Sequence, residues 1–155
     1  MLPTYVIAID ARRDLVNVTL SGFFEVDQVT AFGAALVESH RELRCSPNMH
    51  LSLIDCTDIK IQSQAVVAAF TALVRDSRTR SLRAAMIVGT SLARGQARRV
   101  YPADHDRVAL FPTRAAAEDW LFAPPVSVAR TAFRYPHVPA SPRSAARGYT
   151  APNGA

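Results

Sequence analysis

The sequence places few side chains where they could do chemistry. None of its four histidines occurs in an HxH or HExxH pattern, and no serine lies in a GxSxG motif. Cys45 and Cys56 are eleven residues apart without a CxxC pair, so they predict neither a zinc site nor a disulfide, and both thiols are expected to be free. These residue types and spacings favour a protein that is not an enzyme and that holds no metal ion and no cofactor.

Ser63 is the hydroxyl residue best placed for modification. It precedes a set of apolar residues at helical spacing, which are Val66, Val67, Phe70, Leu73 and Val74. A serine at this position caps a helix by accepting a hydrogen bond from a backbone N–H group. A phosphate there would be tolerated by the helix N-terminus, and it would add a charge of roughly −2 beside Asp55 and Asp58. Helix cap and phosphorylation site are both open interpretations of Ser63.

A second candidate is the turn Gly89-Thr90-Ser91, which lies between an expected strand and an expected helix. Such a turn offers backbone N–H groups to an anion, and Arg94 could face the same anion. The glycine spacing and the Lys-Ser/Thr ending of a P-loop are absent, so nucleotide hydrolysis has no support. The alternative is that Arg94 and Arg98 form a solvated face of the helix.

Charge divides the chain into a domain and a tail. Of the net charge of +5, all but one unit comes from residues 123–155, which hold four arginines, no acidic residue and several prolines. Such a segment cannot bury enough apolar surface to offset its ordering entropy. We therefore expect one domain at residues 3–122 and a basic, proline-rich, flexible tail at residues 123–155.

The nearly neutral domain argues against specific nucleic-acid binding. Its arginines are not interleaved with stacking aromatic residues, and no DNA-binding or RNA-binding motif is present. No apolar run reaches the ~18 residues of a membrane helix, and the first residues lack the features of a secretion signal. The sequence predicts a cytoplasmic protein that is not an integral membrane protein.

The apolar pattern of the domain predicts strands alternating with helices. The expected strands are Tyr5–Asp10, Leu15–Ser21, Leu51–Asp55, Arg83–Val88 and Val108–Phe111. The expected helices run from Asp27 to Leu43, from Ser63 to Asp76, from the Gly89 turn to Pro102, and from Thr113 to Leu121. The first two strands form an antiparallel hairpin because their link is short, and the later strands are parallel because helices connect them. The expected fold class is α/β, a mixed sheet covered by about four helices, mainly on one side.

Several of these segments together resemble a STAS domain, the sulphate transporter and anti-sigma factor antagonist fold. They are the hairpin, the Gly22 turn into a helix, the strand ending Leu53-Ile54-Asp55-Cys56-Thr57, and the strand Met86-Ile87-Val88-Gly89. The sequence is most similar to the SpoIIAA-like branch, also labelled STAS/SEC14. Its ending, Val108–Phe111 followed by Ala115–Leu121, is similar to the "F…EAxxWL" ending of that branch. The resemblance spans residues 4–122.

The resemblance implies a switch at Ser63. In anti-sigma factor antagonists, the loop after the third strand carries an Asp-Ser-Ser/Thr-Gly motif whose hydroxyl residue is phosphorylated by a partner kinase, and the unphosphorylated form binds that partner. The corresponding stretch here is Ile61-Gln62-Ser63-Gln64-Ala65, without the acidic residue and the glycine of the motif. The carboxyl ends of parallel strands meet at one end of a sheet, so this loop and the Gly89 turn are expected to be neighbours.

The sequence therefore predicts a non-catalytic regulatory module whose partner is a kinase or an anti-sigma-like protein. The expected partner-binding residues are Asp55, Thr57, Asp58, Gln62, Ser63 and Gln64, and the expected anion-binding residues are Gly89, Thr90, Ser91 and Arg94. The alternative is a module that binds a lipid or another small ligand, as the STAS/SEC14 label implies. In that case, exposed aromatic residues would line a groove, namely Phe24, Phe122, Phe133 and Tyr135.

Overall fold

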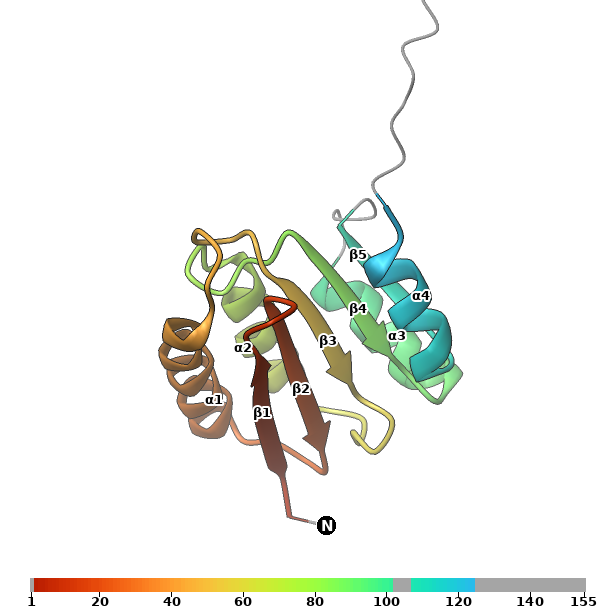
Figure 1. Cartoon of the computed structure of the whole chain (residues 1–155). Helices are drawn as coiled ribbons and strands as arrows, with labels where there is room; N and C mark the ends of the chain where they lie inside the picture. The colour runs from red at the N-terminus through yellow and green to blue at the C-terminus, as the bar shows by residue number, and fades with distance from the viewer. Residues whose placement is uncertain (1, 102–106, 125–155) are drawn as a thin grey trace, which may run out of the picture. The chain divides into compact units, whose positions relative to one another are not determined.

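The structure, a computed structural model, describes residues 2–101 and 107–124. Five strands and four α-helices lie within these residues (Figure 1). The strands are β1 (Thr4–Asp10), β2 (Leu15–Ser21), β3 (Leu51–Asp55), β4 (Arg83–Ile87) and β5 (Val108–Phe111). The helices are α1 (Val26–Ser39), α2 (Gln64–Arg75), α3 (Ser91–Val100) and α4 (Arg114–Phe122), with a short 3-10 helix at His40–Glu42 after α1.

The strands form one mixed sheet in the order β1-β2-β3-β4-β5. β1 and β2 are antiparallel, and the Asp10 carboxylate stabilises their turn by accepting hydrogen bonds from the backbone N–H groups of Arg12 and Arg13 at 3.0 and 3.3 Å. The pairs β2–β3, β3–β4 and β4–β5 are parallel. The predicted mixed α/β sheet is confirmed. Its parallel strands all end at the side of the molecule where α1, α2 and α3 begin (Figure 1).

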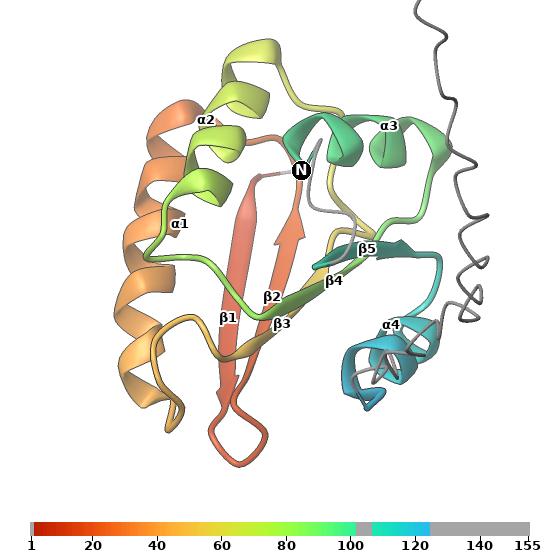
Figure 2. The same cartoon turned by 90° about the horizontal axis from the view of Figure 1, so that it is seen from above.

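Alternating side chains of the strands build two separate cores, one on each face of the sheet. Val18 and Met86 belong to the core under α1, α2 and α3. Leu53 and Ile87 point the other way and pack with Leu121 of α4. Figure 2 shows α1 to α3 on one side of the sheet and α4 on the other. Helices were expected mainly on one side; three of them lie there, and α4 crosses over because β3 and β4 are apolar on both faces.

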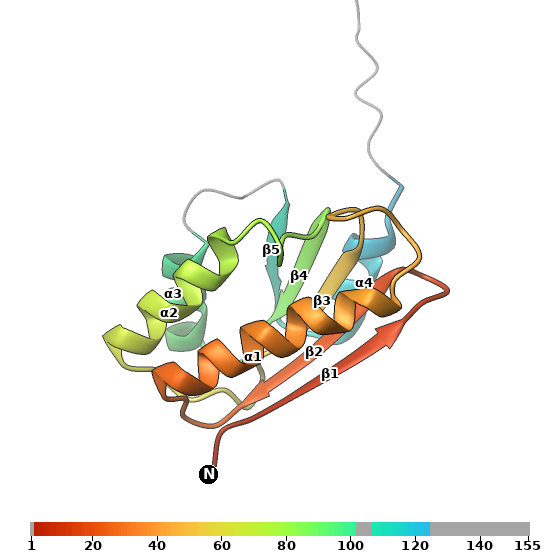
Figure 3. The ribbon, with the colours of Figure 1, turned by 90° about the vertical axis from the view of Figure 1, so that its left-hand side faces the viewer.

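The helices begin where the sequence places capping residues. Ser63, Thr90 and Thr113 each accept a hydrogen bond from the backbone N–H group three residues later. The cap at Ser63, one of the two interpretations that the sequence left open for this residue, is thus present in the structure. Glu25 and Gln28 form a reciprocal capping box at the start of α1. α1 and α2 run side by side on the same face of the sheet (Figure 3).

The tail predicted at residues 123–155 lies outside the described residues, apart from Ala123 and Pro124. Phe133 and Tyr135, two of the four aromatic residues suggested for a ligand groove, lie outside them as well.

Candidate functional site

The loops after β3 and β4 lie side by side, as predicted. Residues 56–63, here called the site loop, follow β3, and Gly89 follows β4. A Cβ atom on Gly89 would lie 3.7 Å from both Cγ2 and the carbonyl oxygen of Thr57. The backbone N–H group of Cys56 donates to the carbonyl oxygen of Ile87 at 2.9 Å, which extends the sheet pairing into the start of the site loop.

Asp55 and Thr57 shape the first turn of the site loop. The Asp55 carboxylate accepts hydrogen bonds from the Thr57 backbone N–H group at 3.0 Å and from the Thr57 hydroxyl at 2.6 Å, both on Oδ1. Asp55 is half-buried, whereas Thr57 and Asp58 are exposed. The Asp55 carboxylate therefore stabilises the turn of the loop through its hydrogen bonds to Thr57. Thr57 and Asp58 face outward.

Gly22 fixes the middle of the site loop. Its N–H group donates to the carbonyl oxygen of Asp58, and its own carbonyl oxygen accepts from the N–H group of Lys60, both at 3.1 Å. Gly22 has a φ of 80°, and a Cβ atom there would lie 2.7 Å from the carbonyl oxygen of Leu2. Only glycine suits this position, because the backbone is left-handed there and the surroundings leave no room for a side chain.

Gln62 joins the site loop to its surroundings and is a buried residue, only 8% exposed. Its Oε1 atom accepts from the N–H group of Phe24 at 2.8 Å, and its Nε2 atom donates to the carbonyl oxygens of Gly22 and Lys60 at 2.9 and 2.5 Å. Its backbone N–H and C=O groups both pair with the side-chain amide of Gln96 in α3 at 2.9 Å. The sequence placed Gln62 at the partner surface; burial makes it a positioning residue instead.

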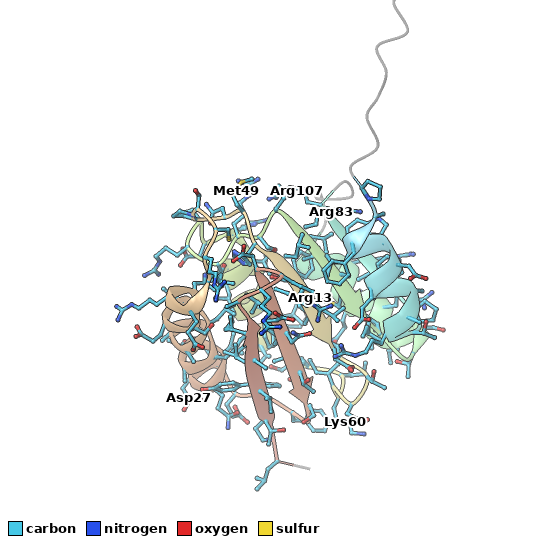
Figure 4. All side chains as sticks on the ribbon, in the orientation of Figure 1. Arg13, Asp27, Met49, Lys60, Arg83 and Arg107 are labelled. Carbon is cyan, nitrogen blue, oxygen red and sulfur yellow. The ribbon has the colours of Figure 1, made fainter. Side chains whose placement is uncertain are left out.

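The site loop therefore has an inner side and an outer side. Cys56, Ile59 and Gln62 face the interior, where Cys56 and Gln62 are buried and Ile59 packs against the core. The remaining residues of the loop, together with Gln64, are exposed; they are Thr57, Asp58, Lys60, Ile61 and Ser63. Lys60 lies at the lower end of the molecule in Figure 4, where the parallel strands end. The outer side is available to a partner, and the inner side is not.

Cys56 is not a nucleophile in this setting. Burial, and to a smaller extent the charge of Asp55, raises the pKa of the Cys56 thiol to about 12. The thiolate is the reactive form of cysteine, so this thiol is inert at neutral pH. Cys56 is a free thiol, as the sequence predicted, and it is buried.

Ser63 is exposed and caps α2. Its Oγ atom accepts a hydrogen bond from the N–H group of Val66 at 3.3 Å. An exposed hydroxyl at a helix N-terminus is accessible to an enzyme, and a phosphate there would meet favourable backbone N–H groups. The geometry is thus compatible with both interpretations of Ser63, and phosphorylation stays a prediction.

The turn after β4 is exposed at the N-terminus of α3, which is one feature of an anion site. Gly89, Thr90 and Ser91 are exposed at the start of α3, but the Thr90 hydroxyl already accepts from the N–H group of Ala93 at 3.1 Å. The Nε atom of Arg94 is buried, without a hydrogen-bond partner among the described residues. The anion site therefore remains a prediction.

Exposed apolar side chains occur in the site loop and in the two segments that are hydrogen-bonded to it, the turn after β2 and α3. Phe23 is 56% exposed just after Gly22, Ile61 is 37% exposed in the loop, and Leu92 is 64% exposed in the first turn of α3. The sequence had suggested an exposed Phe24, but Phe24 is buried and packs edge-on against Phe70. Phe23 takes the exposed position in its place, because Gly22 turns the chain between β2 and α1.

A partly open cavity of about 140 Å³ lies between the sheet and the helices α2 and α3, lined by the inner side of the site loop and also by residues that precede β4 and β5, such as Ser81 and Arg107. Apolar side chains of both layers line it, such as Ile54, Phe70 and Met86. Gln62 and Gln96 line it where the site loop meets α3. Sequence reasoning did not foresee this cavity, and it did not find Gln96.

Among the described residues there is neither a cluster of metal-ligating side chains nor a helix that could span a membrane. No three side chains of histidine, cysteine, aspartate or glutamate gather there to hold a metal ion. No helix in the same part of the chain has the length and apolar character needed to cross a membrane.

Solved structures share this fold. An uncharacterized protein of the DUF3478 family with a SpoIIAA-like fold from Shewanella loihica is 21% identical, with a TM-score of 0.55 over 78% of this chain and 96% of that one. An anti-sigma factor antagonist from Mycobacterium paratuberculosis is 13% identical, with a TM-score of 0.51 over 76% of this chain and 94% of that one. No protein-family model and no curated protein matches the sequence. The chain has a SpoIIAA-like, STAS-like fold, which confirms the resemblance seen in the sequence.

Proposed function

We propose that this protein is a non-catalytic regulatory module that binds a partner protein through the outer side of the site loop. The observation that carries the proposal is the composition of this surface. The loop carries exposed polar residues together with exposed Ile61, and the two segments that are hydrogen-bonded to it carry exposed Phe23 and Leu92. Aromatic and aliphatic anchors within a polar rim are typical of protein interfaces.

The rigidity of the site loop supports the same proposal. Ile87 holds the start of its backbone, Gly22 holds the middle, and Gln96 holds it at Gln62, so its outer side chains are already arranged before a partner arrives. A preorganised surface loses less conformational entropy on binding. The fold's likeness to an anti-sigma factor antagonist suggests a regulatory protein as the partner.

Phosphorylation of Ser63 would regulate this surface. A phosphate adds a charge of roughly −2 at pH 7. It would stand next to Gln64 on the outer side, which also carries exposed Asp58, and it would repel an acidic partner surface. The helix cap itself would survive, because the N-terminus of α2 favours negative charge.

Affinity purification from the native lysate tests the proposal. The tagged full chain is compared with Ile61→Asp and Phe23→Asp, and bound proteins are determined by mass spectrometry. Leu82→Asp is the matched control, because Leu82 is 43% exposed but lies before β4, at the opposite end of that strand. We expect a partner that both site variants lose and the control retains. Equal capture by all four proteins would contradict the proposal.

A second candidate function is the binding of a small apolar ligand or lipid. The cavity of about 140 Å³ with a largely apolar lining favours it, as does the STAS/SEC14 resemblance. Native mass spectrometry of the full chain purified from its own cells tests this function. A bound lipid or metabolite mass supports it, and the mass of the chain alone speaks against it.

A further inference from the structure

The site loop also lines one part of the cavity between the sheet and the helices α2 and α3. We propose that an apolar molecule in this cavity controls the partner-binding surface, with the Gln62–Gln96 pair transmitting the effect. This inference rests on the proposed function, because the surface that it regulates is the outer side of the site loop.

The two sides of the loop give the proposal its geometry. Cys56, Ile59 and Gln62 line the cavity. Their sequence neighbours, Thr57 and Ile61 among them, are exposed on the outer side. The loop forms no helix or strand of its own, so a single layer of irregular backbone separates the cavity from the partner surface. A molecule in the cavity would therefore touch the back of the residues that a partner touches from outside.

The size and lining of the cavity define the occupant. Its volume of about 140 Å³ is close to that of an apolar cavity of ~150 Å³ that binds benzene, but this cavity is partly open, and Arg80, Ser81 and Arg107 also line it. Ala93 and Ala97 of α3 contribute methyl groups to the lining, and Met86 and Val88 line the side formed by β4 and the turn after it. The expected occupant is a benzene-sized apolar molecule, or the apolar end of a longer one.

Gln96 links the occupant to the loop. It lies on α3 among the lining residues, and its amide makes both hydrogen bonds to the backbone of Gln62. A shift of α3 against the sheet must therefore move Gln62 or break this pair. A filled cavity gives Cys56 and Ile59 contacts that an empty one lacks, so the occupant favours the loop conformation seen here. By linkage, a partner that binds this conformation binds the occupied protein more tightly.

Hydrogen exchange of the full chain with and without benzene tests the coupling. The readout is a peptide that covers the site loop, where the N–H groups of Lys60 and Gln62 are hydrogen-bonded. We expect benzene to raise the melting temperature and to slow exchange in this peptide by about fivefold or more, the lower end of typical allosteric coupling.

Two kinds of variant make the test specific. Gln96→Leu removes the amide pair, and we expect it to abolish the protection by benzene while benzene still raises the melting temperature. Arg99→Leu, an exposed change on the same helix, is the control and keeps the protection. Ala97→Leu fills the cavity from α3 and should prevent the shift in melting temperature. If that variant does not fold, Ala93→Val fills less of the same space.

Two results would overturn the inference. One is a benzene-induced shift in melting temperature without any change in exchange of the site loop. The other is no shift at all in the wild-type chain, which would mean that the cavity takes no such ligand. Neither result would contradict the proposed partner-binding surface, because that surface is tested separately by protein capture with Ile61→Asp and Phe23→Asp. Failure of the coupling and failure of the proposed function are therefore distinguishable.

Discussion

Gln62 and Gln96 exchange two hydrogen bonds that join the site loop to α3. The Gln96 side chain accepts from the Gln62 backbone N–H group and donates to the Gln62 carbonyl oxygen, each at 2.9 Å. At the same time, the Gln62 side chain pairs with the backbone of Phe24, Gly22 and Lys60. One residue thus binds the turn after β2, the site loop and α3 together.

Replacing Gln62 should destabilise the protein. Gln62→Leu leaves the buried N–H group of Phe24 without its acceptor and removes a donor from the carbonyl oxygens of Gly22 and Lys60, although Gly22 keeps its bond from the Lys60 N–H group. A buried polar group left unpaired costs about 1–3 kcal/mol. We expect the free energy of unfolding, measured by urea denaturation, to fall by about 2–4 kcal/mol. Gln64→Leu, an exposed change two residues later, should stay within about 0.5 kcal/mol of wild type. Equal stabilities of the two variants would contradict the role of Gln62.

Gly22 and Gly95 should respond in opposite directions to alanine. At Gly22 a methyl group meets the carbonyl oxygen of Leu2, and the φ of 80° is unfavourable for alanine, so we expect a loss of about 1–3 kcal/mol. At Gly95, in the interior of α3, nothing lies within 4 Å of the added Cβ atom. Gly95→Ala should therefore stabilise the protein by up to about 1 kcal/mol. Thermal unfolding of both variants measures the difference, and a stabilised Gly22→Ala would disprove the strain.

The local parts of the fold could be predicted from the sequence, and the long-range polar contacts could not. Strands such as Leu15–Ser21 and Val108–Phe111 show in the apolar pattern, and the cap at Ser63 shows in the residue type. Gln62 and Gln96 are 34 residues apart, and a pair of amide side chains leaves no periodic signal. The sequence could therefore place the site loop at the correct end of the sheet without showing what holds it.

The aromatic residues after β2 show the same limit. Alternation along a strand tells which side chains face the core, but Gly22 turns the chain and ends that pattern. Which of the consecutive residues Phe23 and Phe24 is buried then depends on contacts with α2, where Phe70 packs against Phe24. The cavity behind the loop depends on side-chain packing between two layers, which no single segment reveals.

Arg83 should stabilise the end of α4 through the geometry of its guanidinium group and not through its charge alone. Its guanidinium group donates to the carbonyl oxygens of Trp120 and Ala123 at 2.6 and 3.1 Å, and it lies over the Trp120 ring, 4.1 Å from the centroid. A lysine cannot reproduce the planar contact and the paired donors, so Arg83→Lys should cost about 1–2 kcal/mol of stability. The fluorescence of Trp120, the single tryptophan, reports the local change, which exposed Arg99→Lys should not cause.

Stability should fall in mild acid because of His50. This residue is only 2% exposed, its Nε2 atom has no hydrogen-bond partner among the described residues, and its ring lies 4.4 Å from that of His40. Burial, followed by the nearby His40, lowers the pKa of His50 from 6.5 to about 4. Between these values the unfolded chain binds a proton that the folded chain does not. The free energy of unfolding is therefore unaffected by His50 above pH 6.5 and falls by about 3 kcal/mol on the way to pH 4.

Urea denaturation at several pH values between 7 and 4.5 measures this loss. His50→Leu removes the group and should flatten most of the pH dependence, leaving the smaller effect of His40, whose pKa is also lowered by burial. Met49→Leu changes an exposed neighbour and should keep the wild-type profile. An unchanged profile in His50→Leu would assign the acid sensitivity to other groups. Asp76 titrates lower, because the hydrogen bonds from Arg78 lower its pKa to about 2.

Substitutions at Ser63 can separate its role as a cap from its role at the surface. Ser63→Ala removes the acceptor for the Val66 N–H group, so we expect it to lose about 1 kcal/mol of stability. Ser63→Asp keeps a capping oxygen and adds a negative charge that the N-terminus of α2 favours, so its stability should equal that of wild type. A partner lost by Ser63→Asp but retained by the less stable Ser63→Ala would respond to charge at the surface and not to the state of the helix. A partner retained by both would leave Ser63 with the cap alone.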